Sequence, residues 1–342
     1  MKPTTAPRLA AVLAAIALSA GCGDAFAQSI ARDVARDLDR MESLQGVTVE
    51  ELISPEGPVR RSVVQARPWR ARIETLSPAS HAGELFIYDG AQVTMWWPQQ
   101  RFGVRVRGLP APARAEVRTH IERFTRATMD AYAISLRGDD ERVAKRSTYQ
   151  WRVTPTHRSP YRHRHTVWND QRYPVPLRMT FVDDEGAPWY GMQFESVAFD
   201  QPVADEAFAF EFPENAVVFE WDLASPGITL EEARARMNFP VVMPTHLPAG
   251  HTVQKIVESD HCLPMIAVLM NRGASTVLLT EIRDMGLTQP PLGKTVTFGG
   301  KTGVLSFMGT FATVTWVQGG ALLSLSGNVG YPELLAIAES VK

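Results

Sequence analysis

Four alternating basic residues, Arg162-His163-Arg164-His165, are the residues whose types and spacing come closest to a chemical site. On a strand, side chains two positions apart share a face, so His163 and His165 would both reach one metal ion. No nearby carboxylate or cysteine clearly completes such a site. We therefore interpret the run as a solvated, basic strand face. The alternatives are a metal site and a contact with an anionic headgroup or a partner.

His261 and Cys262 form a second, weaker pair of metal-ligating residue types. The sequence has two cysteines, and the other one is Cys22. A single cysteine beyond the N-terminal region cannot form an internal disulfide, so stability must come from hydrophobic cores. We interpret Cys262 as a small buried apolar residue.

The common signatures of catalysis are missing from the sequence. It contains no Gly-x-x-x-x-Gly-Lys-Ser/Thr phosphate loop, no Gly-x-Gly-x-x-Gly fingerprint, no Gly-x-Ser-x-Gly elbow and no His-Glu-x-x-His pair. A formal charge of -2 argues against a general nucleic-acid binder, which would be basic. The sequence thus favours a protein that works by binding, without a cofactor or a metal. A hydrolase or a metalloenzyme is the third and weakest hypothesis.

The N-terminal region predicts export. Lys2 and Arg8 precede an uncharged apolar run over residues 9–20, which is too short to span a bilayer. This order is typical of a secretory signal peptide, here residues 1–27, with Ala25-Phe26-Ala27 as the cleavage pattern. Residues 18–22 also look like a lipobox, in which the signal would end at residue 21 and Cys22 would be acylated. Both interpretations predict the periplasm or cell envelope, and the second adds anchoring to the outer membrane as a lipoprotein.

Hydrophobic periodicity then predicts an α+β protein of two domains. One apolar stripe indicates a helix over residues 29–44, and period-two alternation follows in short strands separated by turns such as Asp89-Gly90. A second helical stretch opens at Pro110, more strands follow, and Phe208, Phe210 and Phe212 continue the alternation. The predicted helices and strands before the linker make up a first domain over residues 28–222.

A linker is predicted at residues 223–227. Directly after it, Thr229 and Glu232 have the spacing of a capping box, which marks a fresh helix start. We therefore expect a smaller α+β C-terminal domain over residues 228–342, with several strands and a last helix from Pro332.

The order of several short motifs resembles the lipoprotein-carrier fold of LolA- and LolB-like carriers and of the periplasmic stress regulator RseB (MucB). In the family, glycine usually stands at the place of Lys145, so this sequence departs from the pattern there. The C-terminal marks Leu247-Pro248-Ala249-Gly250 and Glu333-Leu334 to Ser340 resemble a small domain found in bacterial envelope and sporulation proteins. The marks of the first domain are Arg67-Pro68-Trp69-Arg70, Ile87-Tyr88-Asp89-Gly90, Trp97-Pro98, Arg142 to Arg146, Thr154-Pro155, Val167-Trp168-Asn169-Asp170, Pro176-Leu177-Arg178 and Phe208-Ala209-Phe210.

The resemblance implies a strongly curved antiparallel sheet, an open half-barrel closed by helices, that holds a ligand on its apolar side. Exposing acyl chains to water costs about 0.8 kcal/mol per CH2, which such a cavity avoids. We expect it to bind an acyl chain, a lipid or a lipidated protein in lipoprotein sorting or sensing. The alternative is an RseB-like envelope-stress regulator that binds a membrane anti-sigma factor. The candidate cavity residues are Trp69, Ile87, Trp96, Val106, Phe124, Trp151, Val167, Met179 and Phe194.

Overall fold

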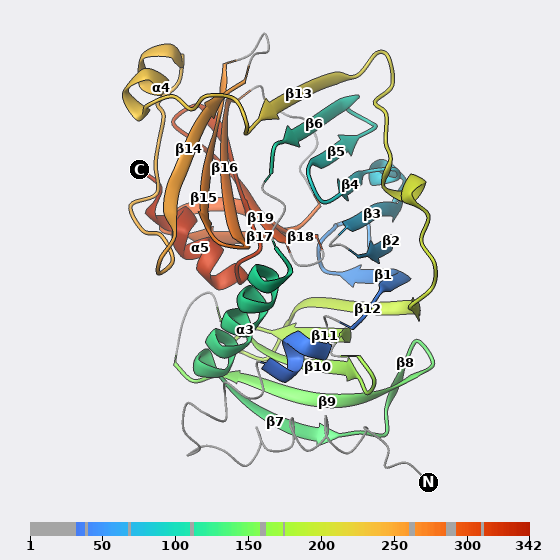
Figure 1. Cartoon of the computed structure of the whole chain (residues 1–342). Coiled ribbons are helices and arrows are strands. Elements are labelled where there is room, and N and C mark those ends of the chain that lie inside the picture. The colour runs from blue at the N-terminus through green and yellow to red at the C-terminus, as the bar shows by residue number, and fades with distance from the viewer. Residues whose placement is uncertain are drawn as a thin grey trace. The chain divides into compact units, whose positions relative to one another are not determined.

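The computed structural model of the chain describes residues 32–37, 40–67, 70–109, 113–157, 162–173, 175–259, 264–284, 292–308 and 311–342. The predicted signal peptide with Cys22, the cavity candidate Trp69 and the pair His261-Cys262 lie outside the described residues. The described part is mostly strand with few helices (Figure 1), which confirms the predicted β-rich chain. Closure of the sheet by helices and an independent C-terminal domain stay predictions.

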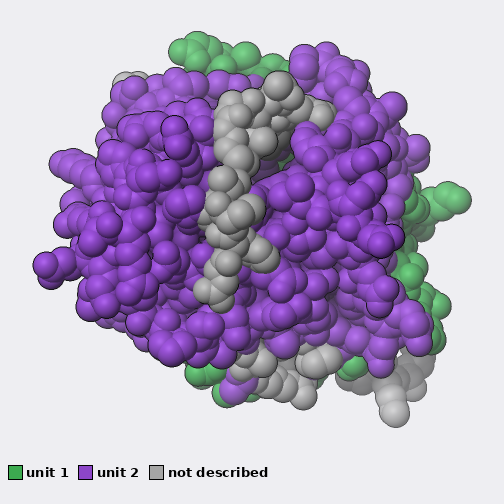
Figure 2. All heavy atoms as spheres, turned by 90° about the horizontal axis from the view of Figure 1, so that it is seen from above, with its two compact units in different colours: residues 1–52, 114–202 green, residues 53–113, 203–342 purple. Residues whose placement is uncertain are grey.

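Residues 1–52 and 114–202 make up one compact unit, and residues 53–113 and 203–342 make up the other (Figure 2). We call them unit 1 and unit 2 and describe each by itself. Each unit combines segments that are far apart in sequence, because strands from these segments pair with each other. The predicted boundary at residues 223–227 stays a prediction.

Unit 1 is a run of antiparallel strands in the order β1-β12-β11-β10-β9-β7, with β8 paired to β9. One long helix, α3 (Arg114–Ala131), leads directly into β7, the strand at the far end of this order, and contacts it. The strands are β1 (Ser43–Glu51), β7 (Tyr132–Gly138), β8 (Arg142–Val143), β9 (Arg146–Pro155), β10 (Arg164–Asp170), β11 (Pro176–Val182) and β12 (Pro188–Phe199).

Unit 2 contains two runs of strands. The first has the order β13-β6-β5-β4-β3-β2, and the second has the order β14-β15-β16-β20-β19-β18-β17. The first comprises β2 (Val59–Ala66), β3 (Arg70–Ser77), β4 (Leu85–Tyr88), β5 (Val93–Trp97), β6 (Phe102–Arg107) and β13 (Val217–Asp222), with short 3-10 turns at Ala79–His81 and Asp205–Phe208. The second comprises β14 (Thr252–Glu258), β15 (Met265–Arg272), β16 (Ser275–Arg283), β17 (Lys294–Phe298), β18 (Lys301–Met308), β19 (Phe311–Gln318) and β20 (Ala321–Gly327), with helices α4 (Leu230–Arg236) and α5 (Tyr331–Ser340).

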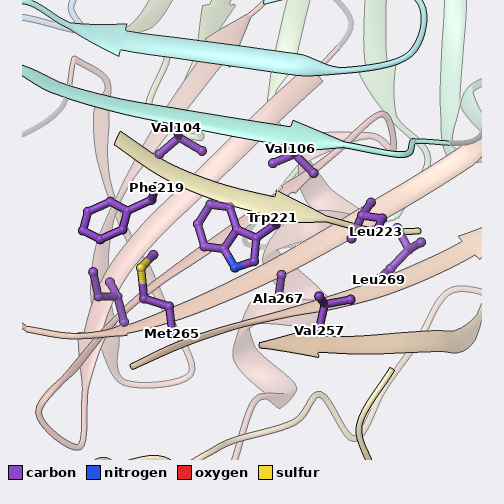
Figure 3. Close-up of a cluster of buried hydrophobic side chains, with 10 residues drawn as sticks. Val104, Val106, Phe219, Trp221, Leu223, Val257, Met265, Ala267 and Leu269 are labelled. Carbon is purple, nitrogen blue, oxygen red and sulfur yellow. The ribbon is translucent and has the colours of Figure 1, made fainter. Parts of the chain in front are cut away.

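The core of unit 2 joins its two runs of strands. Side chains of β6 and β13 meet those of β14 and β15, with Trp221 among them (Figure 3). Non-polar side chains from both segments of the unit thereby leave water together, which is the main favourable term in folding. The buried members are Val104, Val106, Phe219, Trp221, Leu223, Val257, Met265, Ala267, Leu269 and Ile282.

The capping box predicted at the start of the second domain is confirmed. The hydroxyl oxygen of Thr229 accepts a hydrogen bond from the backbone N–H of Glu232 at 3.1 Å. The carboxylate of Glu232 accepts one from the backbone N–H of Thr229 at 2.7 Å. The pair satisfies N–H groups that the first turn of α4 leaves free.

Three local predictions differ from the structure. Residues 32–37 are helical, but β1 already begins at Ser43, so the predicted helix to residue 44 extends too far. β13 pairs with β6 in parallel, so the sheet is not wholly antiparallel. Phe208, Phe210 and Phe212 alternate without forming a strand. Rings of this segment instead pack on Trp96, with centroid distances of 6.2 Å to Phe210 and 5.8 Å to Phe212.

Candidate functional site

One side of the unit 1 sheet carries apolar and aromatic side chains across five neighbouring strands. Residues paired across antiparallel strands share a face, as do residues two apart along one strand. The cross-strand pairs therefore place the following on one side, which we call the aromatic face: Tyr132, Ile134, Leu136, Tyr149, Trp151, Val153, His165, Val167, Asn169, Met179, Phe181, Tyr190, Met192 and Phe194.

Four of the predicted cavity residues lie on the aromatic face. They are Trp151 on β9, Val167 on β10, Met179 on β11 and Phe194 on β12. Trp151 is 4% exposed and Phe194 is 7% exposed, whereas Val167 and Met179 are half-buried. Val167 pairs with both Trp151 and Met179, so three of the four lie side by side across adjacent strands.

The structure does not place the other candidates with these four. Ile87 and Trp96 belong to a separate buried cluster of unit 2, together with Leu85 and Phe208. Val106 belongs to the core shown in Figure 3. Phe124 lies on α3, and its side chain is 47% exposed.

His165 lies on the aromatic face, so the interpretation of residues 162–165 as a solvated basic strand is wrong for this residue. Its ring stacks on Phe181, with 4.6 Å between centroids and 20° between planes. Tyr132 contacts the same ring edge-on at 5.3 Å. Burial lowers the pKa of His165 to about 4, although a hydrogen bond from Nδ1 to the carbonyl oxygen of His163 opposes the shift. His165 is therefore a neutral, aromatic member of an apolar surface at pH 7.

His163 takes part in a stacked pair as well. Its ring lies 4.0 Å from that of Trp189, with 21° between the planes. Each histidine of the pair thus packs against an aromatic ring. Within the part of the chain that the structure describes, no group of three His, Cys, Asp or Glu residues is arranged to hold a metal ion.

A polar network on the opposite side holds the strands of unit 1 in register. Trp168 points away from the aromatic face, and its indole N–H donates to Glu141 at 2.5 Å. The guanidinium of Arg178 lies 5.0 Å from the Trp168 ring and donates to the other oxygen of Glu141 at 2.6 Å. Charge-assisted hydrogen bonds of this kind are the stronger ones in proteins, so β10 and β11 are tied together.

Asp170, at the end of β10, is a second anchor of this sheet. Its carboxylate accepts hydrogen bonds from Arg146 and from the backbone N–H groups of Arg172 and Tyr173, at 2.8 and 2.9 Å. The residue is almost fully buried, and a buried carboxylate needs such partners. Trp168 and Asp170 therefore both have structural roles in this sheet.

Sequence reasoning missed more than half of the aromatic face. Tyr132, Phe181, Tyr190 and Met192 were not among the predicted cavity residues, and neither was His165. Each lies two residues from another member of the face on its own strand or pairs with one across strands. The alternation of apolar side chains along β10, β11 and β12 was the available signal in the sequence. Assigning those side chains to one common face also requires the register between the strands, which the sequence does not provide.

Among the described residues, no helix is long and apolar enough to cross a membrane.

Comparison with known proteins gives the chain a family relationship. Residues 61–211 match the family model described as the MucB/RseB N-terminal domain. The resemblance to RseB and MucB seen in the sequence is thereby confirmed over this segment. No curated protein matches the sequence.

Solved structures of the same kind align with most of the chain. The MucA/MucB complex of Pseudomonas aeruginosa is 17% identical, with a TM-score of 0.44, over 91% of this chain and 98% of that chain. A crystal structure of MucB is also 17% identical, with a TM-score of 0.49, over 93% of this chain and 98% of that chain. A LolA-superfamily protein from Nitrosomonas europaea is 15% identical, with a TM-score of 0.26, over 54% of this chain and 97% of that chain.

Proposed function

We propose that the chain is a non-catalytic envelope protein that binds the acyl chain of a lipid or of a lipidated protein on the aromatic face. The observation that carries the proposal is the composition of that face. From β7 to β12, each strand contributes apolar or aromatic side chains to it, and the histidine among them is neutral. A hydrocarbon chain finds a non-polar surface there without meeting a charged group on those strands.

The burial pattern of the face supports this ligand. Trp151 and Phe194 are fixed within the unit, whereas Ile134, Val167, Met179 and Met192 keep part of their surface accessible. Unbranched methionine side chains adapt to ligands of varying shape, which suits a flexible acyl chain. Burying ten methylene groups would contribute about 8 kcal/mol before the entropic costs of association are subtracted.

Export and anchoring belong to the same proposal. A signal peptide over residues 1–27 would deliver the protein to the periplasm, and acylation of Cys22 would hold it at the outer membrane. A ligand of the envelope, such as an acyl chain, would be available in either case.

The second candidate function is that of an RseB-like regulator that binds a membrane anti-sigma factor. Its support is the family match over residues 61–211. The printed description of one similar structure, the complex of MucA and MucB, names such an assembly for that protein. The two functions are compatible, because a regulator can respond to a bound lipid.

The test is a fluorescence titration of the purified protein with cis-parinaric acid, a fatty acid that fluoresces in apolar surroundings. Met179→Asp places a charge on the aromatic face at a half-buried position. Thr180→Asp, one residue further, places the same charge on the exposed opposite side. We expect Met179→Asp to weaken binding by at least about tenfold, since a carboxylate is costly to bury, and Thr180→Asp to leave it unchanged. Equal binding by both variants, each shown to be folded, would contradict the proposal.

A further inference from the structure

The aromatic face is interrupted by two polar atoms that have no hydrogen-bond partner within the described part of the protein. The indole Nε1 of Trp151 and the side-chain oxygen of Asn169 are both inaccessible to solvent, and neither has a hydrogen-bond partner among the described residues. Trp151 itself is 4% exposed. Buried polar atoms are nearly always paired in folded proteins, because leaving them unpaired forfeits their hydration. Two of them on one apolar face therefore call for an explanation.

The two atoms belong to neighbouring strands and to the same side of the sheet. In the pairing of β9 with β10, Val167 lies opposite Trp151, and Asn169 lies opposite Tyr149. Trp151 and Asn169 are thus diagonal neighbours, a relationship in which long side chains are within reach of each other. One atom is a donor and the other is an acceptor. Together they present a complementary pair to whatever occupies the face.

A secondary amide is the chemical group that matches this pair. Its carbonyl oxygen accepts from the Trp151 N–H, and its own N–H donates to the Asn169 oxygen. The donor and acceptor of one amide group thus match the acceptor and donor that these two side chains lack. An ester provides the carbonyl but no donor, and it would leave the Asn169 oxygen unpaired beside another acceptor.

We propose that Trp151 and Asn169 form a polar subsite of the aromatic face that selects acyl chains joined through a secondary amide over those joined through an ester. The inference rests on the proposed function, because it concerns the linkage of the acyl chain that the face would bind. N-acylated peptides and N-acylated amino sugars share this linkage, whereas the acyl chains of glycerophospholipids are esters.

The contrast with Trp168 supports a role for the free N–H of Trp151. Trp168 lies on the adjacent strand β10 and faces the other way, and its N–H is taken by Glu141. The N–H of Trp168, on the side of the polar network, therefore has an acceptor. The N–H of Trp151, on the aromatic face, has none among the described residues. Trp168→Phe is a matched control for Trp151→Phe, since both remove one N–H and keep an aromatic ring.

The experiment is isothermal titration calorimetry of the purified protein with two probes of equal chain length, N-dodecanoylglycine and O-dodecanoylglycolate. The probes differ in one group, N–H against O. We expect the amide to bind about 5- to 20-fold more tightly. Trp151→Phe should weaken both probes by about 2- to 10-fold, because both lose the bond to their carbonyl. Asn169→Leu should abolish the preference for the amide, and Trp168→Phe should change neither affinity.

The outcomes separate this inference from the proposed function. Equal binding of the two probes to the unaltered protein would overturn the polar subsite and leave acyl-chain binding intact. Failure of both probes to bind would overturn the proposed function itself. Comparing N-dodecanoylglycine with N-dodecanoylglucosamine then distinguishes the source. Tighter binding of the first indicates an acylated peptide, and tighter binding of the second indicates an acylated amino sugar. The comparison on the unaltered protein remains valid if a variant fails to fold.

Discussion

His165 and Phe181 stack face to face across β10 and β11, with their ring centroids 4.6 Å apart. The stacking holds an ionisable ring within an apolar surface, where its charged form is disfavoured. His165 is therefore uncharged at neutral pH, and protonating it at low pH should destabilise unit 1.

The pH dependence follows from the pKa of His165, which is about 4 in the folded protein and 6.5 ordinarily. Because the folded state binds the proton less well than the unfolded state, stability is complete above pH 6.5 and is lost as the pH falls toward 4. The loss amounts to about 3 kcal/mol at the end of this window. Urea unfolding at pH 7.5 and pH 4.5 should show a smaller loss for His165→Phe than for the wild type. The same substitution at the exposed His157 is the control, and an equal loss in all three proteins would argue against the assignment.

Glu281 gives unit 2 a pH dependence of the opposite sign. The residue is fully buried on β16, and burial raises its pKa to about 7, although the backbone N–H of Val242 donates to it at 3.1 Å. The folded state therefore favours the protonated acid. Stability is complete below pH 4.5 and is lost as the pH rises through 7, by about 3 kcal/mol in all.

Glu281→Gln removes the charge and keeps the shape of the side chain. We expect the variant to be more stable than the wild type at pH 8.5 and to differ little at pH 5. Hydrogen exchange of β15, β16 and β20 reports on unit 2 separately from unit 1. A variant that is less stable at pH 8.5 than the wild type would show that the carboxylate is held in its charged form.

The turn Ala144-Lys145 holds two non-glycine residues in the left-handed region of the backbone. Both residues have positive φ angles, 49° and 65°, in the two-residue connection between β8 and β9. Such turns favour glycine, which adopts positive φ without a steric cost. We expect Lys145→Gly to raise the free energy of unfolding by about 0.5–1 kcal/mol, measured by urea denaturation. Arg142→Gly, at an exposed position of the adjoining strand, should lower it.

Much of the fold was predictable from local patterns. Three features depend only on a few consecutive residues and can therefore be predicted from the sequence alone. They are the capping box at Thr229 and Glu232, the Asp89-Gly90 hairpin and the last helix. The alternation of Phe208, Phe210 and Phe212 was misleading, because an extended segment that lays its rings on Trp96 has the same period as a strand.

The aromatic face was only partly predictable. Trp151, Val167, Met179 and Phe194 were chosen for residue type, but type alone could not separate them from Ile87, Trp96 and Val106. Those three are equally apolar and fill cores in unit 2. Separating the two sets requires the register of strands distant in sequence, which arises from tertiary pairing.

Trp221 tests whether the two runs of strands in unit 2 depend on each other. Its side chain is 2% exposed and lies between β6 and the strands β14 and β15 (Figure 3). Trp221→Ala should cost about 3–5 kcal/mol and weaken the hydrogen-exchange protection of both runs. Loss of protection in β13 and β6 alone would favour an independent C-terminal domain, as the sequence predicts.

Photo-crosslinking with a diazirine-bearing dodecanoyl probe tests most directly whether the aromatic face binds an acyl chain. The probe inserts into whatever its chain contacts, and peptide mass spectrometry locates the adducts. We expect adducts on β9 to β12, at or next to Trp151, Val167, Met179 and Met192, and their loss in Met179→Asp but not in Thr180→Asp. Adducts confined to unit 2, around Ile87 and Trp96, or the absence of saturable labelling, would contradict acyl-chain binding at this face.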